Sequence, residues 1–405
     1  MAALGAFEFL TATSIQFGAG KLAEVPGLLQ KLGVGKPFIV NAGDQGAVGI
    51  PYAALTSLLE AGGIPYASYS VSKEPSTVSV EEAVALSQAS GCDGVVSIGG
   101  GSVIDTGKAV SALLTNGGKP IDYMEVIGAG QAMTKPAQPF IAIPTTSGTG
   151  AEVSKNAVLA SLEHAQKVSL RSEYMLPRVA LVDPELTVGC PPHITATCGM
   201  DALCHCLESY CTHLNTPMTD SLAREGMLRA AKSLLRTFTH GDDVAARGDM
   251  AITSLFGGIS LANAKLGSIH GFAGVLGGMF DGPHGAVVAA TMPAAITINV
   301  RALRAREPQH DSLRRYTEVA RMLTGNGEAT AEDGARWLED MLVKMDVPGL
   351  AHWGVTAADA TPESELVTKS QASSSMKGNP IILTNAEAAE LVLLSLPKAG
   401  VDSKL

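Results

Sequence analysis

Short apolar runs rich in β-branched residues recur through the first half of the chain, each bounded by turn-forming residues. A run without alternating polar positions is typical of a strand that is buried on both faces. Four runs of this kind predict strands at 37–41, 94–99, 139–144 and 178–183. Helical stretches separate them, and strands that alternate with helices indicate a parallel α/β sheet.

One helical stretch carries a start signal. Ser79 is followed by Val80, Glu81 and Glu82, which matches a capping box, in which a serine and an acidic residue satisfy backbone N–H groups at the first turn. We therefore expect a helix to open at Ser79 and to run through EEAVALSQAS.

The pattern changes after about Thr187, where Pro191 and Pro192 break the chain and apolar positions then follow a helical period. Helices are predicted at 194–211, 218–238, 249–266, 312–324, 329–345 and 385–396. A run of helices after a βα region suggests a separate domain. We expect an α/β domain over residues 1–187 and an all-α domain over 188–405, with ligands bound in the cleft between them.

Composition narrows the functional classes. Of 405 residues, 46% are apolar and 17% are charged, which excludes a disordered chain and indicates a large core with some apolar surface in a homodimer or higher homo-oligomer. The net charge of −10 argues against nucleic-acid binding through a basic face. No apolar run reaches the ~18 residues that span a bilayer, so we expect no membrane segment. The start MAALGAFEFL lacks the basic region of a signal peptide.

The six cysteines point to a reducing compartment. Five of them lie between Cys190 and Cys211, too concentrated to join distant segments as disulfides. We therefore expect a soluble, cytoplasmic protein.

A glycine-rich turn follows the strand predicted at 94–99 and opens a helix. Gly99, Gly100, Gly101 and Ser102 let the backbone turn sharply and approach a ligand closely. The helix start offers free N–H groups and a positive dipole end, which suit a pyrophosphate. The turn does not match the G-x-G-x-x-G fingerprint, and a purely structural turn stays open as the alternative.

A second polar turn, 144–152, leaves the next strand and carries Thr145, Thr146 and Thr149. Because ligands bind at the carboxyl ends of parallel strands, both turns are expected to face one ligand. Lys167 is a candidate partner for a phosphate, although a lone lysine is more often a solvated charge.

One aspartate and three histidines form a candidate metal site. Asp201 and His205 are four residues apart in a predicted helix, so they share one face. His270 and His284 follow among frequent glycines, and an Asp with three imidazoles suits a divalent transition metal such as iron or zinc. Spacing alone leaves a surface pair and core histidines as the alternative.

The cysteines offer a rival zinc site at Cys198, Cys204, Cys206 and Cys211. Cys204 and Cys206 point about 200° apart on a helix, so they cannot both join His205 on one metal. We interpret these cysteines as small buried apolar residues.

Ordered motifs along nearly the whole chain resemble the iron-containing (group III) alcohol dehydrogenases. They are FGAGKL at 17–22, GGGSVIDTGKA at 99–109, IPTTSGTGAEV at 143–153, LVDPELT at 181–187, GMDALCHCLESY at 199–210, NAKLGSIHG at 263–271 and GPHG at 282–285. The resemblance implies an α/β dinucleotide-binding domain with a parallel sheet and an all-α metal-binding domain, the dehydroquinate-synthase-like architecture. It also implies NAD- or NADP-dependent interconversion of a small alcohol with its aldehyde or ketone by direct hydride transfer.

The resemblance also implies roles for individual residues. It makes Asp201, His205, His270 and His284 the ligands of one divalent metal, Fe²⁺ by family default and Zn²⁺ as the alternative. On the cofactor side it assigns Gly99, Gly100, Gly101, Ser102, Asp105, Thr145, Thr146, Thr149 and Lys167. Here the metal polarises the substrate oxygen.

Two departures from the family pattern affect the chemistry. Many members carry a further histidine for proton transfer where this chain has Gly274, so the proton must come through water, a ribose hydroxyl or another residue. Many NAD-preferring members carry an aspartate near Ala42, which bonds the ribose 2′-hydroxyl and repels a 2′-phosphate. Ala42 removes that discrimination, but Asp44 is close enough to restore it, so NAD and NADP both stay open.

The substrate pocket is expected to involve Leu261, Phe272, Gly274 and Met279. Two alternatives share the scaffold, namely a dehydroquinate-synthase-like lyase and a metal-free maleylacetate-reductase-like enzyme. The scarcity of basic residues over 245–300 disfavours the lyase, and the complete Asp/His set disfavours the metal-free enzyme. A non-catalytic binding module is the remaining alternative.

Overall fold

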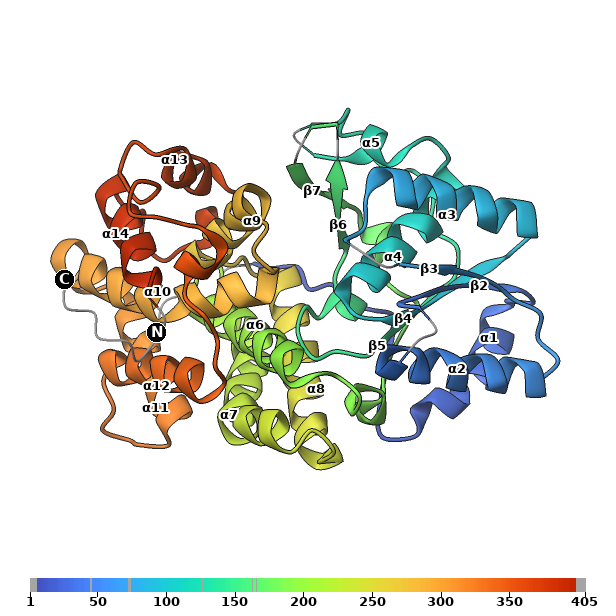
Figure 1. Ribbon diagram of the computed structural model, residues 1–405, viewed down its shortest axis with the longest axis horizontal. Helices are drawn as coiled ribbons and strands as arrows, with labels where there is room; N and C mark the ends of the chain where they lie inside the picture. The colour runs from blue at the N-terminus through green and yellow to red at the C-terminus, as the bar shows by residue number, and fades with distance from the viewer. Residues whose placement is uncertain are drawn as a thin grey trace. The chain divides into compact units, whose positions relative to one another are not determined.

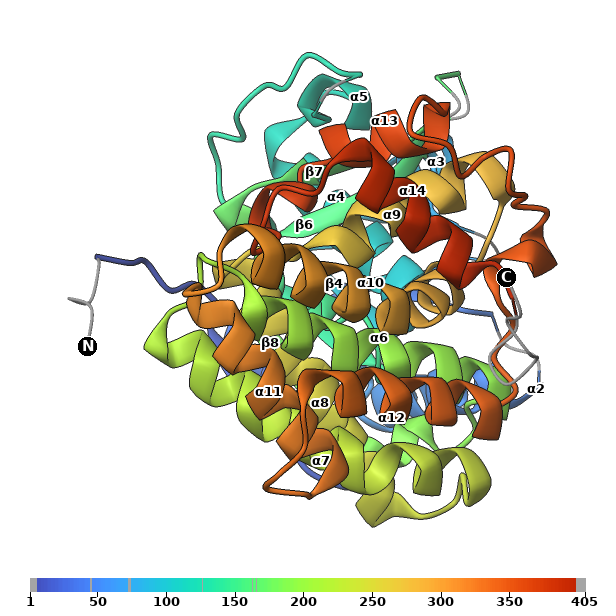
Figure 2. The same cartoon turned by 90° about the vertical axis from the view of Figure 1, so that its left-hand side faces the viewer.

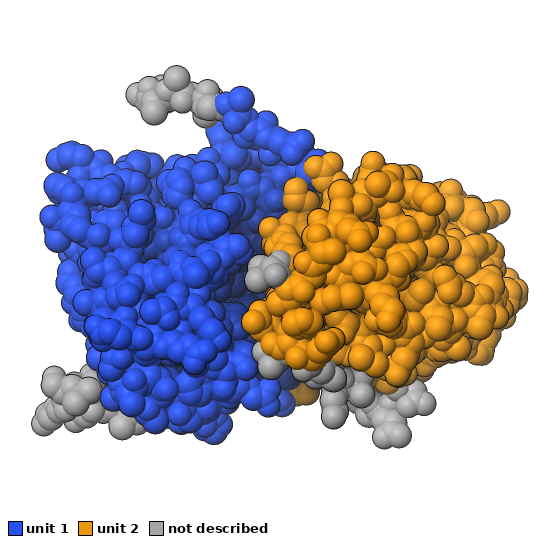
Figure 3. All heavy atoms as spheres, turned by 90° about the horizontal axis from the view of Figure 1, so that it is seen from above, with its two compact units in different colours: residues 1–10, 192–240, 252–405 blue, residues 11–191, 241–251 orange. Residues whose placement is uncertain are grey.

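The structure is a computed structural model, and it describes residues 6–43, 46–71, 74–125, 127–161, 163–164 and 166–397. These residues form two compact units, which Figure 3 colours separately. Unit 2 comprises residues 11–191 and 241–251, and unit 1 comprises the other described residues.

Unit 2 is built on a six-stranded parallel sheet (Figure 1) with the order β1-β8-β5-β4-β2-β3. Its strands are β1 Ser14–Phe17, β2 Pro37–Asn41, β3 Ala67–Ser70, β4 Gly94–Gly99, β5 Phe140–Pro144 and β8 Val179–Val182. The four predicted strands are confirmed as β2, β4, β5 and β8, which are buried along their whole length. The shorter β1 and β3 are additional strands.

Alternating side chains of each buried strand enter two separate cores. Phe38 and Val40 of β2 join the core formed with α3 (Thr77–Ser90) and α4 (Gly101–Asn116). Ile39 points to the opposite face, into the core formed with α1 (Val25–Leu32) and α2 (Gly46–Ala61). Because helices cover both faces, these strands have no polar face, which explains their continuous apolar pattern.

The start predicted for α3 is wrong by three residues. The N-cap is Ser76, whose hydroxyl accepts from the Ser79 N–H at 3.1 Å, while the Ser79 hydroxyl accepts from the Ser76 N–H at 2.9 Å. Ser79 therefore takes the third helical position of a capping box, the place usually held by an acidic residue.

Unit 2 also contains an antiparallel pair that the sequence pattern did not indicate, β6 (Asn156–Ser161) with β7 (Gln166–Arg171). A short helix, α5, spans Pro120–Tyr123. Short 3-10 helices lie at Lys21–Glu24, Ala151–Val153, Glu173–Met175 and Pro184–Thr187, and in unit 1 at Leu350–Trp353 and Met376–Gly378.

Unit 1 is helical (Figure 2), as the sequence predicts. Its helices are α6 Pro192–Cys211, α7 Pro217–Thr239, α8 Val244–Asn263, α9 Ser268–Phe280, α10 His284–Arg306, α11 Asp311–Thr324, α12 Ala331–Lys344, α13 Glu365–Ala372 and α14 Asn385–Ser395; residues 244–251 of α8 belong to unit 2. The six predicted helices are confirmed as α6, α7, α8, α11, α12 and α14, with α8 beginning five residues earlier than predicted; α9, α10 and α13 are additional.

Helix α10 forms the centre of unit 1. It packs against α6, α9, α12 and α14. Among the described residues it is the one helix long and apolar enough to cross a membrane by length and composition, but 89% of its most apolar window is buried inside the protein. Burial of this extent is typical of a core helix.

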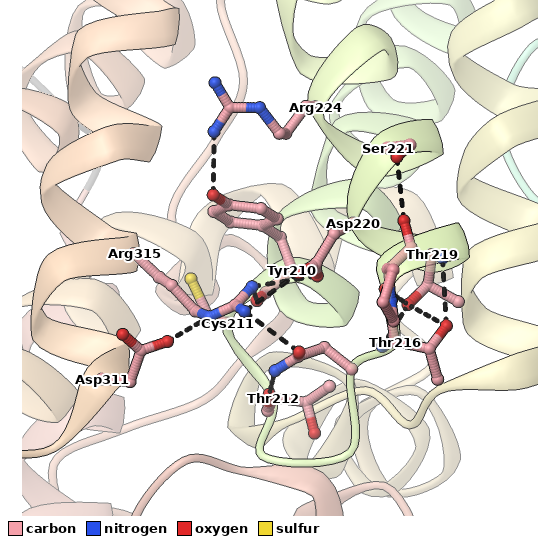
Figure 4. Close-up of polar contacts among 12 residues, drawn as sticks. Tyr210, Cys211, Thr212, Thr216, Thr219, Asp220, Ser221, Arg224, Asp311 and Arg315 are labelled. Atoms are coloured by element: carbon pink, nitrogen blue, oxygen red, sulfur yellow. Dashed lines mark hydrogen bonds and ion pairs between the residues drawn. The ribbon is translucent and has the colours of Figure 1, made fainter. Parts of the chain in front are cut away.

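The carboxyl end of α6 is fixed by a charged cluster (Figure 4). Both terminal nitrogens of Arg315, on α11, donate to the carboxylate of Asp220 at 2.9 Å, and its Nε donates to Asp311 at 2.8 Å. The same guanidinium donates to the Tyr210 carbonyl at 3.0 Å and lies 4.8 Å from the centre of the Tyr210 ring. Arg315 thereby ties α6 to α7 and α11.

Candidate functional site

Helix α6 presents a row of polar side chains on one buried face. Asp201, His205 and Glu208 are spaced by four and then three residues, which places them one above another on a helix. All three residues are buried. The Nε2 atom of His205 lies 3.7 Å from Oδ1 of Asp201.

Two further histidines reach Asp201 from the first turns of other helices. His270 lies in the first turn of α9 and His284 opens α10. Their Nε2 atoms lie 3.3 Å and 3.8 Å from the same Oδ1 of Asp201. The His205 and His270 rings also stack, with centroids 4.6 Å apart. The structure thus brings the four residues predicted as metal ligands together around one carboxylate oxygen.

The distances within this cluster fit a metal better than direct hydrogen bonds. All three exceed the 2.7–3.2 Å of ordinary N–H···O hydrogen bonds. Ligands placed ~2.1 Å from a tetrahedral metal are roughly 3.4 Å from one another, close to the values of 3.3, 3.7 and 3.8 Å found here. Three imidazoles and one carboxylate are also a donor set that iron and zinc accept.

The electrostatics of the cluster favour a positive charge at its centre. Burial would raise the pKa of Asp201, but His205, His270 and His284 hold it well below its usual range. Burial would lower the pKa of His270, yet the hydrogen bonds that its ring donates to Asp201 and Glu208 raise it to about 9. Burial lowers the pKa of His205 to about 4, so this imidazole is neutral near pH 7.

Glu208 belongs to this site, and the sequence interpretation missed it. Its Oε2 lies 2.7 Å from Nδ1 of His270, the ring nitrogen on the side away from Asp201. The signal was present as a third polar residue on the face of Asp201 and His205. Cys204 Sγ lies 3.8 Å from the same Nδ1, and it is fully buried with a pKa raised well above its usual value by burial, as expected for a small apolar residue.

The residues predicted to shape the substrate pocket have different surroundings. Phe272 is fully buried in the interior of unit 1, and Leu261 is half-buried. Gly274 and Met279 are exposed on α9. A Cβ atom added at Gly274 would meet no atom within 4 Å, so this position has room for a side chain.

In unit 2 the structure brings the two predicted cofactor turns together. The Thr145 N–H donates to the Gly99 carbonyl at 3.0 Å, because β4 and β5 are neighbours. A Cβ at Gly101 would lie 2.7 Å from Thr149 Cγ2, and one at Gly100 would lie 3.5 Å from Thr146 Oγ1. Glycine is therefore needed at 101, whereas the contact at Gly100 is an ordinary van der Waals distance.

The glycine turn has the geometry of a phosphate site. Gly100 is the N-cap of α4 and supplies no side-chain cap, so the N–H groups of Gly101 and Ser102 are left for another partner, while that of Val103 donates to the Gly100 carbonyl at 3.0 Å. The sheet order reverses between β2 and β4, and ligands of open parallel sheets bind at such a reversal. Ala42 follows β2 at this point, whereas Asp44 lies outside the described residues.

Lys167 lies apart from these turns in sequence, on β7 of the antiparallel pair. Its Nζ is 3.9 Å from Oε1 of Glu74, and its side chain is 31% exposed. This ion pair is weak at such exposure.

Asp105 belongs to a buried charged group whose other members the sequence interpretation did not single out. Lys108 is fully buried, with Nζ 3.3 Å from Asp105 Oδ1, and it donates to the Asn156 carbonyl at 2.7 Å. Glu152 is also buried nearby, and burial raises its pKa to about 7 although Lys108 opposes the shift. Burial likewise raises the pKa of Asp105 and lowers that of Lys108.

Comparison with known proteins identifies relatives along almost the whole chain. The family model for iron-containing alcohol dehydrogenase matches residues 12–184, and the model for the C-terminal part of the same family matches residues 195–394. The chain is 33% identical to the 4-hydroxybutyrate dehydrogenase of Cupriavidus necator over 356 residues, which cover 86% of this chain and 89% of the relative. It is also 33% identical to the sulfoacetaldehyde reductase of Bilophila wadsworthia, with 87% and 90% covered.

Solved structures give the same result. An alcohol dehydrogenase from Oenococcus oeni superposes with a TM-score of 0.88 at 26% identity, covering 96% of this chain and all of the relative. A 1,3-propanediol oxidoreductase superposes with a TM-score of 0.88 at 28% identity over 97% of this chain. The chain therefore belongs to the iron-containing alcohol dehydrogenase family and is an oxidoreductase that acts on alcohols or aldehydes.

Proposed function

We propose that unit 1 binds one divalent metal through Asp201, His205, His270 and His284, and that unit 2 binds NAD or NADP. The reaction is the interconversion of a small alcohol and its aldehyde or ketone by direct hydride transfer. The observation that supports the metal site best is the convergence of three Nε2 atoms within 3.3–3.8 Å of one Asp201 oxygen. Fe²⁺ is the first candidate and Zn²⁺ the second.

The ligand residues also set the charge of the site. A bound divalent cation supplies Lewis-acid polarisation of the substrate oxygen. Asp201 contributes one negative charge and neutral imidazoles contribute none, which leaves a net positive charge to favour an alkoxide-like transition state. Burial of Asp201 and His205 keeps these ligands shielded from water.

The proposed dinucleotide site rests on the glycine turn and the threonine loop. The uncapped start of α4 suits the pyrophosphate, and Thr145, Thr146 and Thr149 supply hydroxyls beside it. Ala42 carries no carboxylate to repel a 2′-phosphate, so we leave NAD and NADP as two arms of the test.

We also infer a homodimer or higher oligomer in the reducing cytoplasm. Strand β1 is an edge of the sheet, with Ile15 37% and Phe17 38% exposed. Exposed apolar side chains on an edge strand favour pairing with a second chain. All six cysteines are free thiols, in keeping with a reducing compartment. Light scattering coupled to gel filtration tests the oligomer, and a monomeric mass would contradict it.

The direct test is oxidation of NADH and of NADPH with a panel of carbonyl compounds, with and without added ferrous iron. The panel includes short aldehydes and sulfoacetaldehyde, with 4-hydroxybutyrate assayed in the oxidative direction. We expect iron-stimulated turnover with at least one member. No turnover with any compound would instead favour the lyase or the binding module.

A further inference from the structure

Glu208 performs two functions at the start of α9. Its Oε1 accepts from the Ile269 N–H at 2.8 Å, and its Oε2 accepts from the His270 N–H at 3.4 Å. These are N–H groups that a helix leaves without partners in its first turn. A carboxylate also suits the positive end of the helix dipole. Glu208, from α6, therefore caps the helix that carries His270.

The same carboxylate determines which nitrogen of His270 carries a proton. An ionised carboxylate accepts hydrogen bonds and cannot donate them, so at 2.7 Å the Nδ1 atom of His270 must be the donor. In the neutral ring the other nitrogen, Nε2, then has a free lone pair. That lone pair points at Asp201 Oδ1, 3.3 Å away.

Two acceptors placed face to face repel each other unless a positive charge lies between them. The hydrogen bond that Nδ1 donates to Glu208 thus leaves Nε2 as the nitrogen available to a metal. His205 provides the contrast, because its Nδ1 is buried and has no hydrogen-bond partner among the described residues. Of the two histidines stacked on each other, only His270 has a carboxylate on its far nitrogen.

Glu208 packs closely against Gly267. A Cβ at Gly267 would lie 2.9 Å from Glu208 Oε1 and 2.9 Å from Asn379 Oδ1. Asn379 in turn accepts from the Ser268 N–H at 3.0 Å. Glycine at 267 is thus what allows two side chains to cap α9 together.

We propose that Glu208 is a positioning residue of the metal centre: it fixes the proton of His270 on Nδ1 and couples the ligand histidine to the folding of α9. This inference rests on the metal site proposed above. Carboxylates that orient metal-ligating histidines commonly contribute ~10–100-fold to metal affinity.

The test is the substitution Glu208→Gln, which preserves size and one oxygen. If the amide oxygen faces the Ile269 N–H, its NH₂ group faces Nδ1 and favours the proton on Nε2, where it blocks the metal. If the amide turns over, the NH₂ group faces the Ile269 N–H, and two donors meet. The second arrangement is disfavoured because it sets two donors against each other, so we expect the first, which weakens metal binding and retains most of the helix cap.

The measurement is calorimetric titration of chelator-treated protein with Zn²⁺, together with thermal melting of the metal-free forms. We expect Glu208→Gln to weaken Zn²⁺ binding ~10–100-fold, with a metal-free melting temperature close to that of the wild type. Cys204→Ala is the matched control, because it removes another contact of the same Nδ1 and is expected to leave the affinity within about two-fold. Equal Zn²⁺ affinity of Glu208→Gln and wild type, or equal weakening by Cys204→Ala, overturns the proposal.

A second measurement does not depend on a variant that must fold. In Zn²⁺-loaded wild-type protein with ¹⁵N-labelled histidine, long-range nitrogen–proton spectra report which His270 nitrogen is protonated. We expect the proton on Nδ1, and a proton on Nε2 overturns the proposal. Failure of the wild type to bind Zn²⁺ or Fe²⁺ at all contradicts instead the metal site on which the proposal rests.

Discussion

Each unit buries a cluster of charged groups, and the two clusters differ in whether their charges are satisfied from within. In unit 2, Lys108 has three N–H donors and three acceptors, at 2.7 Å from Asn156, 2.9 Å from Ser154 and 3.3 Å from Asp105. In unit 1, Asp201 faces three imidazole nitrogens at 3.3–3.8 Å, too far for good hydrogen bonds. The first cluster is internally paired, and the second has the arrangement that we propose binds a cation.

This difference distinguishes buried charges that stabilise the fold from buried polar groups arranged to bind a ligand. A buried ammonium with every proton paired holds secondary structure together, here α4 with β6. Three imidazole nitrogens that converge on one carboxylate oxygen have the arrangement of a ligand set. Burial and shifted pKa values occur in both clusters, so geometry is what distinguishes them.

The largest effect is expected from His270→Ala. The substitution removes one ligand and the residue that Glu208 orients, so metal binding should be lost and kcat/KM should fall at least ~1000-fold, since metal polarisation contributes several kcal/mol. Metal analysis of the purified variant checks this. His193→Ala, an exposed histidine on α6, is the control and should retain the metal. Full occupancy and activity in His270→Ala would remove His270 from the ligand set.

Lys108→Met tests the internally paired cluster. It removes the buried ammonium that pairs with Asp105 and opposes the pKa shift of Glu152, which should lower the free energy of unfolding by ~3–5 kcal/mol. Urea denaturation measures the change. Lys119→Met removes an exposed lysine, 3.7 Å from Glu81, and should change stability by less than ~0.5 kcal/mol. If both substitutions lower the free energy of unfolding by the same amount, the buried ammonium of Lys108 does not hold the cluster together.

Glu152→Gln should show a pH-dependent effect of the opposite sign. Burial raises the pKa of Glu152 to about 7 from its usual 4.5, so the folded protein binds this proton more tightly than the unfolded chain. Its contribution to stability is full below about pH 4.5 and is lost as the pH rises through 7. The glutamine keeps the neutral form, so the variant should exceed the wild type at pH 8 by roughly 1–3 kcal/mol and approach it near pH 5. An equal difference at both pH values, measured by denaturation, would show that Glu152 does not titrate in this range.

The smallest effect is expected at Gly274, on α9, the helix that carries His270. A Cβ there meets no atom within 4 Å, so Gly274→Ala should stabilise α9 by ~0.5–1 kcal/mol without changing the metal content. Gly271→Ala is the comparison, because its Cβ would lie 3.0 Å from Met376 Cε and should give a smaller gain. Loss of stability in Gly274→Ala, followed by thermal melting, would mean that the space at this position is not available.

The sequence predicts the elements whose burial is uniform or one-sided. Strands β2 and β4 were predicted at their full length because both faces are covered, and α11 was predicted because its apolar positions form one stripe. The edge strands β1 and β3 are short and half-polar, and they lack that signal.

The hydrophobic pattern did not indicate helices α9 and α10, for two different reasons. Helix α9 contains several glycines, which lower helix propensity, and α10 contains Pro293 and is buried nearly all round. Yet both carry a residue of the candidate metal site at their first turn. The ligand types could be predicted from the sequence, and Glu208 shares their helix face, whereas Lys108 becomes distinct only when distances are known, because lysines are usually surface charges.

The most direct test of the proposed metal site around Asp201 is titration of metal-free enzyme with Fe²⁺ under anaerobic conditions. Bound metal and reductase activity are measured in the same samples. We expect activity to rise in proportion to bound iron and to reach its plateau at one metal per chain. Full activity of the metal-free enzyme, or iron bound at that stoichiometry without any gain in activity, would contradict it.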